Sequence, residues 1–446
     1  MAVISAEKTP DRAPPLSETS VLGWLQKNLF SSPVNVFLTV SSIYIIYLVL
    51  SWVLTWGIID AVWTAENRRE CFDISKDGAC WAGVLTWMDN IIYGRYPREE
   101  LWRVNVGTLL LVLWMAPIWI PRVKGKMFTG ISTVMLYPFL ATYFFAGGDK
   151  GIFMQVMLTL ATTCLIGTTL NAIIGFTSGR SLPEFILQTM GKGEAQNEAE
   201  EKGQRNLLLG ILGASLAAVF VWQLSWGFVE VTWTKWGGMF LTLVISGVGI
   251  TTALPGGIIL ALGRRSKLPV ISVLSTSFIE IFRSVPLITI LFMATTMFPL
   301  FMPDGFVINK LVQVIIAVSL FSACYMAETV RAGLQAIPKG QYEGAHTIGL
   351  GYWKMMGLIV MPQALKLMIP NIVGSFIGLL KDTTLVSIIG LFDILGMLRA
   401  ISQDVPWIGL HIEPLVFGAS LFFVICFAMS KYSRHLEATL SAGDNR

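Results

Sequence analysis

The stretch that decides the fold is IPKGQYEGAHTIGLGYWKMMGLIVMPQALKLMIP, residues 337–370, which is polar and of helical length yet lies between apolar runs. Pro338 suits the first turn of a helix, because the N–H that proline lacks would be unpaired there. Helical turns are predicted from Lys339 to about Ile348, and Gly349 and Gly351 are predicted to end them. Pro362 and the final proline then predict a second break and a return to apolar surroundings.

The composition places this polar segment in a membrane protein. Of the 446 residues, 54% are hydrophobic and only 13% are charged, and the mean hydropathy is +0.66. A soluble chain of this length needs far more charge to cover its surface, whereas a helix that crosses a bilayer needs roughly 20 apolar residues. We therefore expect an integral, polytopic, all-α membrane protein. Residues 1–35 are polar and the first apolar run is already span-sized, so no cleavable signal is expected.

Ten apolar runs are long enough to be transmembrane helices. They are Val36–Ile59, Val104–Pro121, Phe128–Ala146, Ile152–Gly175, Leu207–Trp226, Gly237–Leu262, Leu274–Leu300, Leu311–Val330, Pro370–Gly390 and Pro414–Ser430. Basic residues gather on alternate connections, most densely in RVKGK (122–126) and GRRSK (263–267). Because cytoplasmic connections are enriched in Lys and Arg, both ends of the chain are predicted to be cytoplasmic tails, residues 1–35 and 431–446.

Two polar insertions divide the chain. Residues 60–103 form a predicted external loop that contains several tryptophans. Residues 178–206 form a predicted cytoplasmic linker, which includes the low-complexity sequence GKGEAQNEAEEKGQR. The linker separates the first four spans from the rest of the chain. Both insertions lie within a predicted N-terminal transmembrane extension, residues 36–226, which is followed by a second group of spans, residues 237–430.

Several kinds of site can be weighed from single residues. Cys71 and Cys80 share the external loop, and the sequence leaves open whether they form a disulfide, which requires an oxidising compartment.

The net charge of +4 does not indicate a nucleic-acid partner. Glu343-x-x-His346 has the spacing of half a di-iron site, but the other two histidines lie in no such pair, so no metal is expected. No G-x-x-x-x-G-K-[S/T] sequence occurs, so the chain lacks that phosphate-binding loop and is not expected to hydrolyse ATP itself.

The polar helix carries a glycine at its centre, in Glu343-Gly344-Ala345. A glycine inside a helix costs roughly 1 kcal/mol relative to alanine. One explanation is that another protein surface approaches the backbone closely at this point. The alternative is an ordinary interfacial loop helix, and the spacing alone leaves both open.

This segment resembles the signature loop of binding-protein-dependent ABC importer permeases. The family pattern is E-A-A, three residues and G, followed after nine or so residues by I-x-L-P. The matching residues here are Glu343-Gly344-Ala345, Gly349 and Ile359-Val360-Met361-Pro362, with departures at Gly344 and Met361. Flanking motifs resemble the polar amino-acid branch: Glu280-x-Phe282-Arg283-x-x-Pro286-Leu287, Ala327-Glu328-x-x-Arg331-x-Gly333, Ile337-Pro338-Lys339-Gly340-Gln341 and Lys381-Asp382-Thr383. With its extra N-terminal spans, the chain is similar to a permease subunit of general L-amino-acid transporters of the Aap/Bzt type.

The resemblance implies a type I ABC importer (MetI-like) permease core over residues 237–430, preceded by extra transmembrane helices. In that family the loop, here residues 337–362, is a coupling helix that sits in a cleft of a cytoplasmic ATPase. The implied ATPase-coupling residues are Pro338, Lys339, Gln341, Glu343, Gly344, Ala345, Gly349 and Pro362. ATP and Mg would be bound by the partner ATPase, and this chain would carry no cofactor.

The implied assembly lies in the bacterial inner membrane. Its expected parts besides this chain are a second permease subunit that is a different, related chain, an ATPase dimer, a periplasmic amino-acid-binding protein and lipid. This chain would form the translocation path of an ATP-driven importer and would not be an enzyme. The alternative is an ion-gradient-driven secondary transporter of amino acids or other small polar solutes, which predicts an inverted repeat. No convincing repeat relates residues 1–226 to 237–446, and no catalytic cluster supports a membrane enzyme.

Charged residues lie in or beside the eighth and ninth spans. They are Glu328, Arg331, Lys381 and Asp382, with Thr383 next to them. An ionised side chain at mid-membrane costs at least about 2.5–3.5 kcal/mol, so such residues are usually paired or functional. One interpretation is that they pair with one another and lock the bundle. The other is that Lys381, Asp382 and Thr383, together with Glu328, line or gate the amino-acid path.

Overall fold

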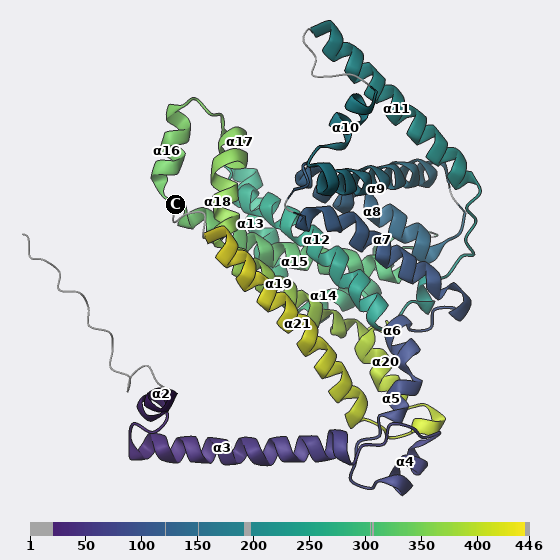
Figure 1. Cartoon of the computed structure of the whole chain (residues 1–446), viewed down its shortest axis with the longest axis vertical. Helices are drawn as coiled ribbons and strands as arrows, with labels where there is room; N and C mark the ends of the chain where they lie inside the picture. The colour runs from purple at the N-terminus through teal and green to yellow at the C-terminus, as the bar shows by residue number, and fades with distance from the viewer. Residues whose placement is uncertain are drawn as a thin grey trace, which may run out of the picture. The chain divides into compact units, whose positions relative to one another are not determined.

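The computed structural model describes residues 21–120, 122–149, 151–190, 198–303, 305 and 307–441 (Figure 1). Across these residues the regular elements are helices, and the extended pairings are isolated β-bridges. Eight helices in the described ranges are long and apolar enough to cross a membrane, and the number rises to ten if each of two bent helix pairs is one span. The prediction of an all-α, polytopic membrane bundle is confirmed.

The N-terminal half of the described chain contains five of these candidate spans. They are α3 (Pro33–Leu54) with its continuation η1 (Thr55–Ile59), α7 (Leu101–Trp119), α8 (Lys126–Ala146), α9 (Ile152–Ser178) and α11 (Glu198–Leu224). The shorter helices are α2 (Val21–Asn28), α4 (Arg68–Ile74), α5 (Ala82–Thr86), α6 (Met88–Tyr93), η2 (Arg98–Glu100) and α10 (Leu182–Thr189). Each span predicted for this half corresponds to one of the five long helices.

The C-terminal half contains unbroken spans and the two bent pairs. The unbroken spans are α12 (Gly238–Arg264), α15 (Lys310–Ala336) and α21 (Ile412–Ser441). The first pair joins α13 (Pro269–Ser284) to α14 (Leu287–Phe292), η4 (Met293–Met297) and η5 (Phe298–Phe301). The second joins α17 (Tyr352–Met355), η6 (Met356–Val360) and α18 (Met361–Leu367) to α19 (Ile369–Asp382) and η7 (Thr383–Ser387). The shorter elements are η3 (Trp233–Lys235), α16 (Lys339–Thr347), α20 (Ile394–Ile401) and η8 (Val405–Trp407).

The seventh predicted span, Leu274–Leu300, is wrong as a single straight helix. α13 and the helix that starts at Leu287 meet at a bend of 105°. The helix stops after Ser284 because Val285 is extended and Pro286 has no N–H to continue the backbone hydrogen bonds. Counting apolar residues overlooks this break, because the two sides together are long and apolar enough to be counted as one span.

The ninth predicted span, Pro370–Gly390, starts too late. In the structure the apolar helix begins at Tyr352 and bends by 64° just before Ile369. Of the two prolines predicted to mark a second break, Pro370 lies directly after the bend, whereas Pro362 lies in the first turn of α18, directly after the π-helical turn η6, and marks no such bend. The polar loop between apolar helices is therefore shorter than the predicted residues 337–362.

The predicted linker, residues 178–206, is mostly helical where it is described. α10 occupies part of it, and α11 begins at Glu198, well before the predicted start of its span at Leu207. Residues 191–197 lie outside the described part of the chain. The charged residues at the start of α11 are compatible with a helix because Glu and Lys are good helix formers, so charge alone does not indicate a loop.

The predicted tails are also helical where they are described. α2 lies within the predicted N-terminal tail, and residues 1–20 are outside the described part. α21 continues past Lys431 without a break up to Ser441, and residues 442–446 are outside the described part.

The described chain divides into two compact units. The first contains the residues up to Thr86 together with Gln403–Glu413, and the second contains Trp87–Ser402 together with the residues from Pro414 onward. The predicted external loop, residues 60–103, is thus not one structural piece, because its last part belongs to the second unit.

Within the first unit, a disulfide joins Cys71 to Cys80, and both cysteines are buried. The guanidinium of Arg68 donates to the carbonyl oxygen of Ile408 at 2.9 Å. The backbone N–H of Cys80 donates to the carboxylate of Glu413 at 3.2 Å. These contacts bring a C-terminal loop against the loop that follows α3, a pairing that no local sequence pattern indicates.

In the second unit, the extension packs around a buried arginine. The side chain of Arg103 is 0% exposed and donates to the carbonyl oxygens of Phe144 and Val229, each at 2.7 Å. Its guanidinium also lies over the ring of Phe228, and the Glu100 carboxylate is 3.6 Å away. A buried charge is tolerated only when it is hydrogen-bonded or paired, so Arg103 joins α7, the end of α8 and the connection that follows α11.

A polar contact fixes α11 on α9. The amide of Gln223, which is fully buried, accepts from the hydroxyl of Thr159 at 3.0 Å and donates to that of Thr162 at 2.6 Å. Hydrogen bonds of this kind between membrane helices contribute about 0.6 kcal/mol on average.

Glycines allow the extension to touch the core at one end of α12. Gly94 follows α6 with φ +67°, and a Cβ there would lie 2.3 Å from the Cα of Gly237. Gly238 has φ +62°, and its N–H donates to the carbonyl oxygen of Phe392 at 2.8 Å. Only glycine fits these positions, because a side chain would meet backbone atoms.

Asp393 is buried beside this contact and caps α20. Its Oδ1 accepts from the N–H of Gly396 at 2.9 Å, while its Oδ2 has no hydrogen-bond partner among the described residues. Burial raises the pKa of Asp393 to about 7, although the backbone N–H groups of Gly396 and Leu395 act to lower it.

This raised pKa predicts that the folded chain loses stability as the pH rises. The pKa of the unfolded carboxyl is near its ordinary value, so the folded state binds more protons between about pH 4 and pH 7 and becomes less stable across that window. Each pKa unit corresponds to about 1.4 kcal/mol. Asp393→Asn keeps a cap of similar quality and removes the ionisation. We expect its melting temperature in detergent to fall less than that of the unmodified chain between about pH 5 and pH 7.5.

Glu184→Gln is the control for this pH effect. Glu184 is exposed, and hydrogen bonds from the Ser181 backbone and from Lys124 lower the pKa of its carboxyl. A carboxyl with a lowered pKa makes the folded chain more stable as the pH rises, so removing it does not reduce the loss of stability that Asp393 causes. If the melting temperatures of Asp393→Asn and of the unmodified chain change equally with pH, Asp393 does not cause the loss of stability.

Candidate functional site

The polar segment between the apolar helices forms the helix that the sequence predicts. α16 spans Lys339–Thr347, and Gly349 follows it with φ +75°, which ends the helix. Pro338 precedes α16 with extended backbone angles, so it stands just before the first turn and not within it as predicted.

One side of α16 is fixed to the core. Ala345 is 1% exposed and lies in a hydrophobic cluster with Val330 and Leu334 of α15. The hydroxyl of Tyr342 donates to the carbonyl oxygen of Leu334 at 3.2 Å. The amide of Gln341 accepts from Gln363 of α18 at 3.2 Å. α16 is therefore held by both α15 and α18, so that movement of α16 is passed to them.

The opposite side of α16 is open. At Gly340 and Gly344, a Cβ would have no other atom of this chain within 4 Å. Lys339 and Glu343 are exposed on the same helix, and Trp353, just after it, is 74% exposed. Exposed backbone without side chains is a surface that a second protein can approach closely.

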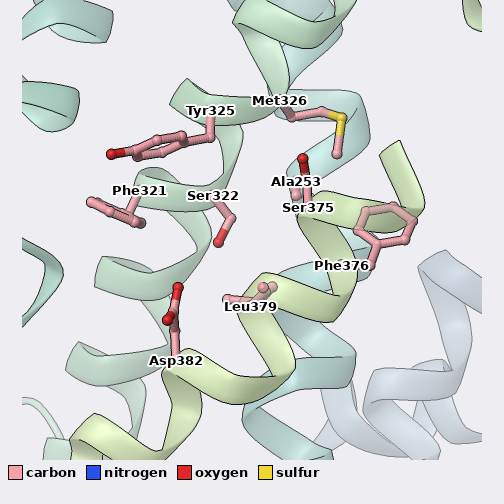
Figure 2. Close-up of a pocket in the computed structure, with 10 residues that line it drawn as sticks. Ala253, Phe321, Ser322, Tyr325, Met326, Ser375, Phe376, Leu379 and Asp382 are labelled. Carbon is pink, nitrogen blue, oxygen red and sulfur yellow. The ribbon is translucent and has the colours of Figure 1, made fainter. Parts of the chain in front are cut away.

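A cavity of about 250 Å³ lies among α12, α15 and α19. Its lining residues are Ala253, Phe321, Ser322, Tyr325, Met326, Ser375, Phe376, Gly378, Leu379 and Asp382. Figure 2 shows the Asp382 carboxylate and the Ser322 hydroxyl turned toward the same space, with Tyr325 further along α15. The cavity thus combines the Asp382 carboxylate and the Ser322 hydroxyl with apolar walls, and Tyr325 and Ser375 are further polar residues of its lining. A few polar groups within apolar walls are the usual character of a site for a small polar ligand.

The structure separates the three neighbouring residues that were predicted to line the path. Asp382 lines the cavity, as the second interpretation requires. Lys381 is exposed and is not among the lining residues. Thr383 is 1% exposed, and its hydroxyl donates to the carbonyl oxygen of Leu380 at 2.7 Å, so it turns back on its own helix. Path roles for Lys381 and Thr383 stay predictions.

Glu328 and Arg331 lie in an ion-pair network outside the cavity. We call it the Glu328 cluster; its members are Arg264, Glu280, Arg283, Glu328 and Arg331. Glu328 Oε2 accepts from Nε and Nη2 of Arg331 at 2.8 and 2.7 Å, and its Oε1 is paired with Arg264. For these two residues the pairing interpretation describes what the structure shows.

Several site residues escaped the sequence reasoning. Ser322 and Tyr325 are three residues apart on α15, and Ser375 and Asp382 are seven apart on α19, so each pair shares a helix face. Polar residues repeated on one face of an apolar run were the signal that would have found them. Arg264 was used only to orient the chain.

The arrangement has the chemistry of a site that binds a small polar ligand. The described residues contain no group of three or more His, Cys, Asp or Glu side chains that could hold a metal ion. A carboxylate and hydroxyls within a helical bundle can instead hold the charged and polar groups of a small molecule.

Comparisons with known proteins identify relatives of the C-terminal half and of nearly the whole chain. Residues 253–441 match the family described as "Binding-protein-dependent transport system inner membrane component". The "Inner membrane amino-acid ABC transporter permease protein YhdY" of Escherichia coli K12 is 35% identical over 437 residues, which cover 97% of each chain. The "Glutamate/glutamine/aspartate/asparagine transport system permease protein BztC" of Rhodobacter capsulatus is 36% identical over 449 residues, which cover 98% of each. A chain in the crystal structure of an amino acid ABC transporter with histidines is 29% identical over 45% of this chain and 92% of its own, with a TM-score of 0.41.

Proposed function

This chain belongs to the family of binding-protein-dependent transport system inner membrane components, and we propose that it imports amino acids as one permease subunit of an ATP-driven transporter. Both relatives that it matches from end to end are named as amino-acid permeases, and the match includes the N-terminal extension. Membership in this family favours an ATP-driven importer over an ion-gradient-driven secondary transporter.

The observation that carries the proposal is the open side of α16. A helix that is anchored to α15 and α18 on one side, and has bare backbone at Gly340 and Gly344 on the other, can pass force from a docked protein into the bundle. We assign that docked protein as the ATPase, which binds ATP and Mg. Lys339 and Glu343 would meet its surface, whereas Ala345 and Gln341 would fix the helix to the core.

The cavity is the proposed place where the amino acid passes. The Asp382 carboxylate would pair with the ammonium group of the substrate, and the hydroxyls of Ser322, Tyr325 and Ser375 would bind its polar atoms. The volume of about 250 Å³ lies just below the range usual for drug-sized ligands, which suits a smaller molecule such as one amino acid. The apolar walls would strengthen such an ion pair, because a low-dielectric surrounding weakens the screening of its charges.

The wider assembly follows from the same proposal. The chain would lie in the bacterial inner membrane with both ends in the cytoplasm, beside a second, related permease subunit, and would receive cargo from a periplasmic binding protein. The disulfide between Cys71 and Cys80 supports an oxidising location for the loop after α3. Transport would occur by alternating access, in which the bundle opens either inward or outward. ATP and cargo would each shift this equilibrium only as far as they bind one of the two states more tightly than the other.

Cross-linking from α16 tests this proposal. The chain is purified with its native neighbours after a photo-reactive amino acid has been placed at His346, which is exposed on α16. We expect a cross-link to an ATPase subunit. The control position is Ile259, which is exposed on the apolar surface of α12 and should give no such product. An α16 that cross-links to no ATPase, or that is labelled by a reagent confined to the outside, would contradict the proposal.

A further inference from the structure

One arginine touches both the cavity wall and the Glu328 cluster. The guanidinium carbon of Arg283 lies 5.5 Å from the ring centroid of Tyr325, which lines the cavity. Nη1 of the same guanidinium is 3.5 Å from Oε1 of Glu328. A cation over an aromatic ring is attracted to it, so Arg283 connects the wall to the cluster by two separate interactions.

Arg283 lies at a bend between two helical segments and faces a partner that is held by other residues. It lies in the last turn of α13, just before the 105° bend that leads into α14. Glu328 is held independently by Arg264 and Arg331, so it provides a fixed anchor for the arginine. Bends of this kind, where a proline interrupts the helix, are points at which one helical segment can turn relative to the next.

The anchor is in turn connected to α16. Glu328 lies on α15, less than two turns before Leu334, whose carbonyl oxygen accepts from the Tyr342 hydroxyl of α16. The end of α12 reaches the same tyrosine, because Arg265 lies next to Arg264 and its Nη1 is 3.5 Å from the Tyr342 hydroxyl. Contacts therefore run from the cavity through Tyr325 and Arg283 to Glu328, and the helices α15 and α12 that hold this cluster each contact Tyr342 of α16.

We propose that Arg283 is a positioning residue through which occupancy of the cavity is reported to α16. Cargo that shifts the Tyr325 ring also shifts Arg283, which changes the angle between α13 and α14 and the restraint on Glu328. Coupling requires an element with two arrangements that both sites bias, and the α13–α14 bend is that element. This inference rests on the proposed function, because it assumes a separate ATPase docked on α16.

The test compares two rates, ATP hydrolysis without cargo and ATP hydrolysis stimulated by cargo-loaded binding protein. The transporter is purified as a whole and placed in lipid vesicles, and ATP hydrolysis is measured with and without its binding protein, using L-glutamate, L-glutamine, L-aspartate and L-asparagine as probes. For Arg283→Gln we expect unstimulated hydrolysis to be retained and the stimulation by loaded binding protein to fall roughly three- to thirtyfold. Arg283→Lys should give an intermediate loss, because lysine keeps the charge but not the planar group that stacks on a ring.

Glu280→Gln is the matched control. Glu280 belongs to the same cluster and lies 3.1 Å from Arg264, but it is the most exposed member, and the ion pairs of the described residues do not join it to Arg283. Its stimulation should equal that of the unmodified transporter. A merely structural role for Arg283 would instead lower the melting temperature and reduce both rates in proportion, which would overturn the inference.

A double variant gives a second, independent result. If Arg283 acts through the tyrosine, the transporter that carries both Arg283→Gln and Tyr325→Leu should be stimulated by loaded binding protein as much as the single variant with the lower stimulation. If the fold-loss of stimulation in the double variant equals the product of the two single losses, the residues act independently and the inference is contradicted. Full stimulation of Arg283→Gln would contradict only the role of Arg283, whereas an unmodified transporter without ATP-dependent uptake of any probe would contradict the proposed function itself.

Discussion

Gly344→Trp is expected to abolish ATP-driven uptake while the chain remains folded and inserted. The position is open within this chain, since a Cβ at Gly344 meets no other atom of it within 4 Å. The indole should therefore be accommodated without disturbing Ala345 or Tyr342, which hold α16 to the core on the other side. It would, however, occupy the space that the docked ATPase needs, so that the ATPase is lost or misplaced.

The measurement is ATP-dependent uptake into vesicles, together with the amount of ATPase that co-purifies with the chain. Gly344→Ala should retain both, because the family pattern has alanine at this position and alanine favours a helix by roughly 1 kcal/mol over glycine. Gly210→Trp is a bulk control, because Gly210 on α11 is equally open but belongs to the extension. Normal uptake by Gly344→Trp would show that no partner approaches this side of α16.

Asp382→Asn is expected to lower uptake by about 10- to 100-fold, which corresponds to the loss of one hydrogen bond to a charged group. Asparagine matches the shape of aspartate, so the walls formed by Phe321 and Leu379 should stay in place. What is lost is the negative charge that would pair with the substrate ammonium group. The binding protein should bind its cargo as before, because the change lies in the membrane subunit.

Asp382→Glu is the companion variant, and it should recover part of the uptake because it restores the carboxylate. Lys381→Ala tests the path role predicted for the neighbouring residue, which is exposed in this structure. If Asp382→Asn assembles normally and transports at the unmodified rate, the cavity is not the substrate path. If it fails to assemble, Asp382 serves packing instead.

The parts of the fold that the sequence predicts are those that local chemistry decides. The apolar runs predict the spans of the extension, and the glycine at position 349 predicts the end of α16. The two bends were missed because a run of apolar residues looks the same whether the helix is straight or broken, and Pro286 was considered part of a span. The contact of Arg68 with Ile408 joins segments that are far apart in the chain, so no local pattern contains it.

Some residues of the candidate site could likewise be predicted from the sequence, and others could not. A carboxylate in an apolar helix is conspicuous, so Asp382 was singled out, whereas serine and tyrosine are ordinary in such helices and were passed over. The partners of Glu328 were missed for a different reason. Arg264 and Arg283 come from α12 and α13, and only the packing of these helices on α15 brings them to the carboxylate.

Vesicle uptake by the purified assembly tests the central claim most directly. The probes are the four amino acids named above, and the assembly contains this chain, its partner permease and the ATPase, with the binding protein added outside. We expect accumulation that requires ATP, the ATPase and loaded binding protein together, and that is lost when any one is left out. Accumulation by this chain alone, driven by a proton or sodium gradient without ATP, would contradict the account.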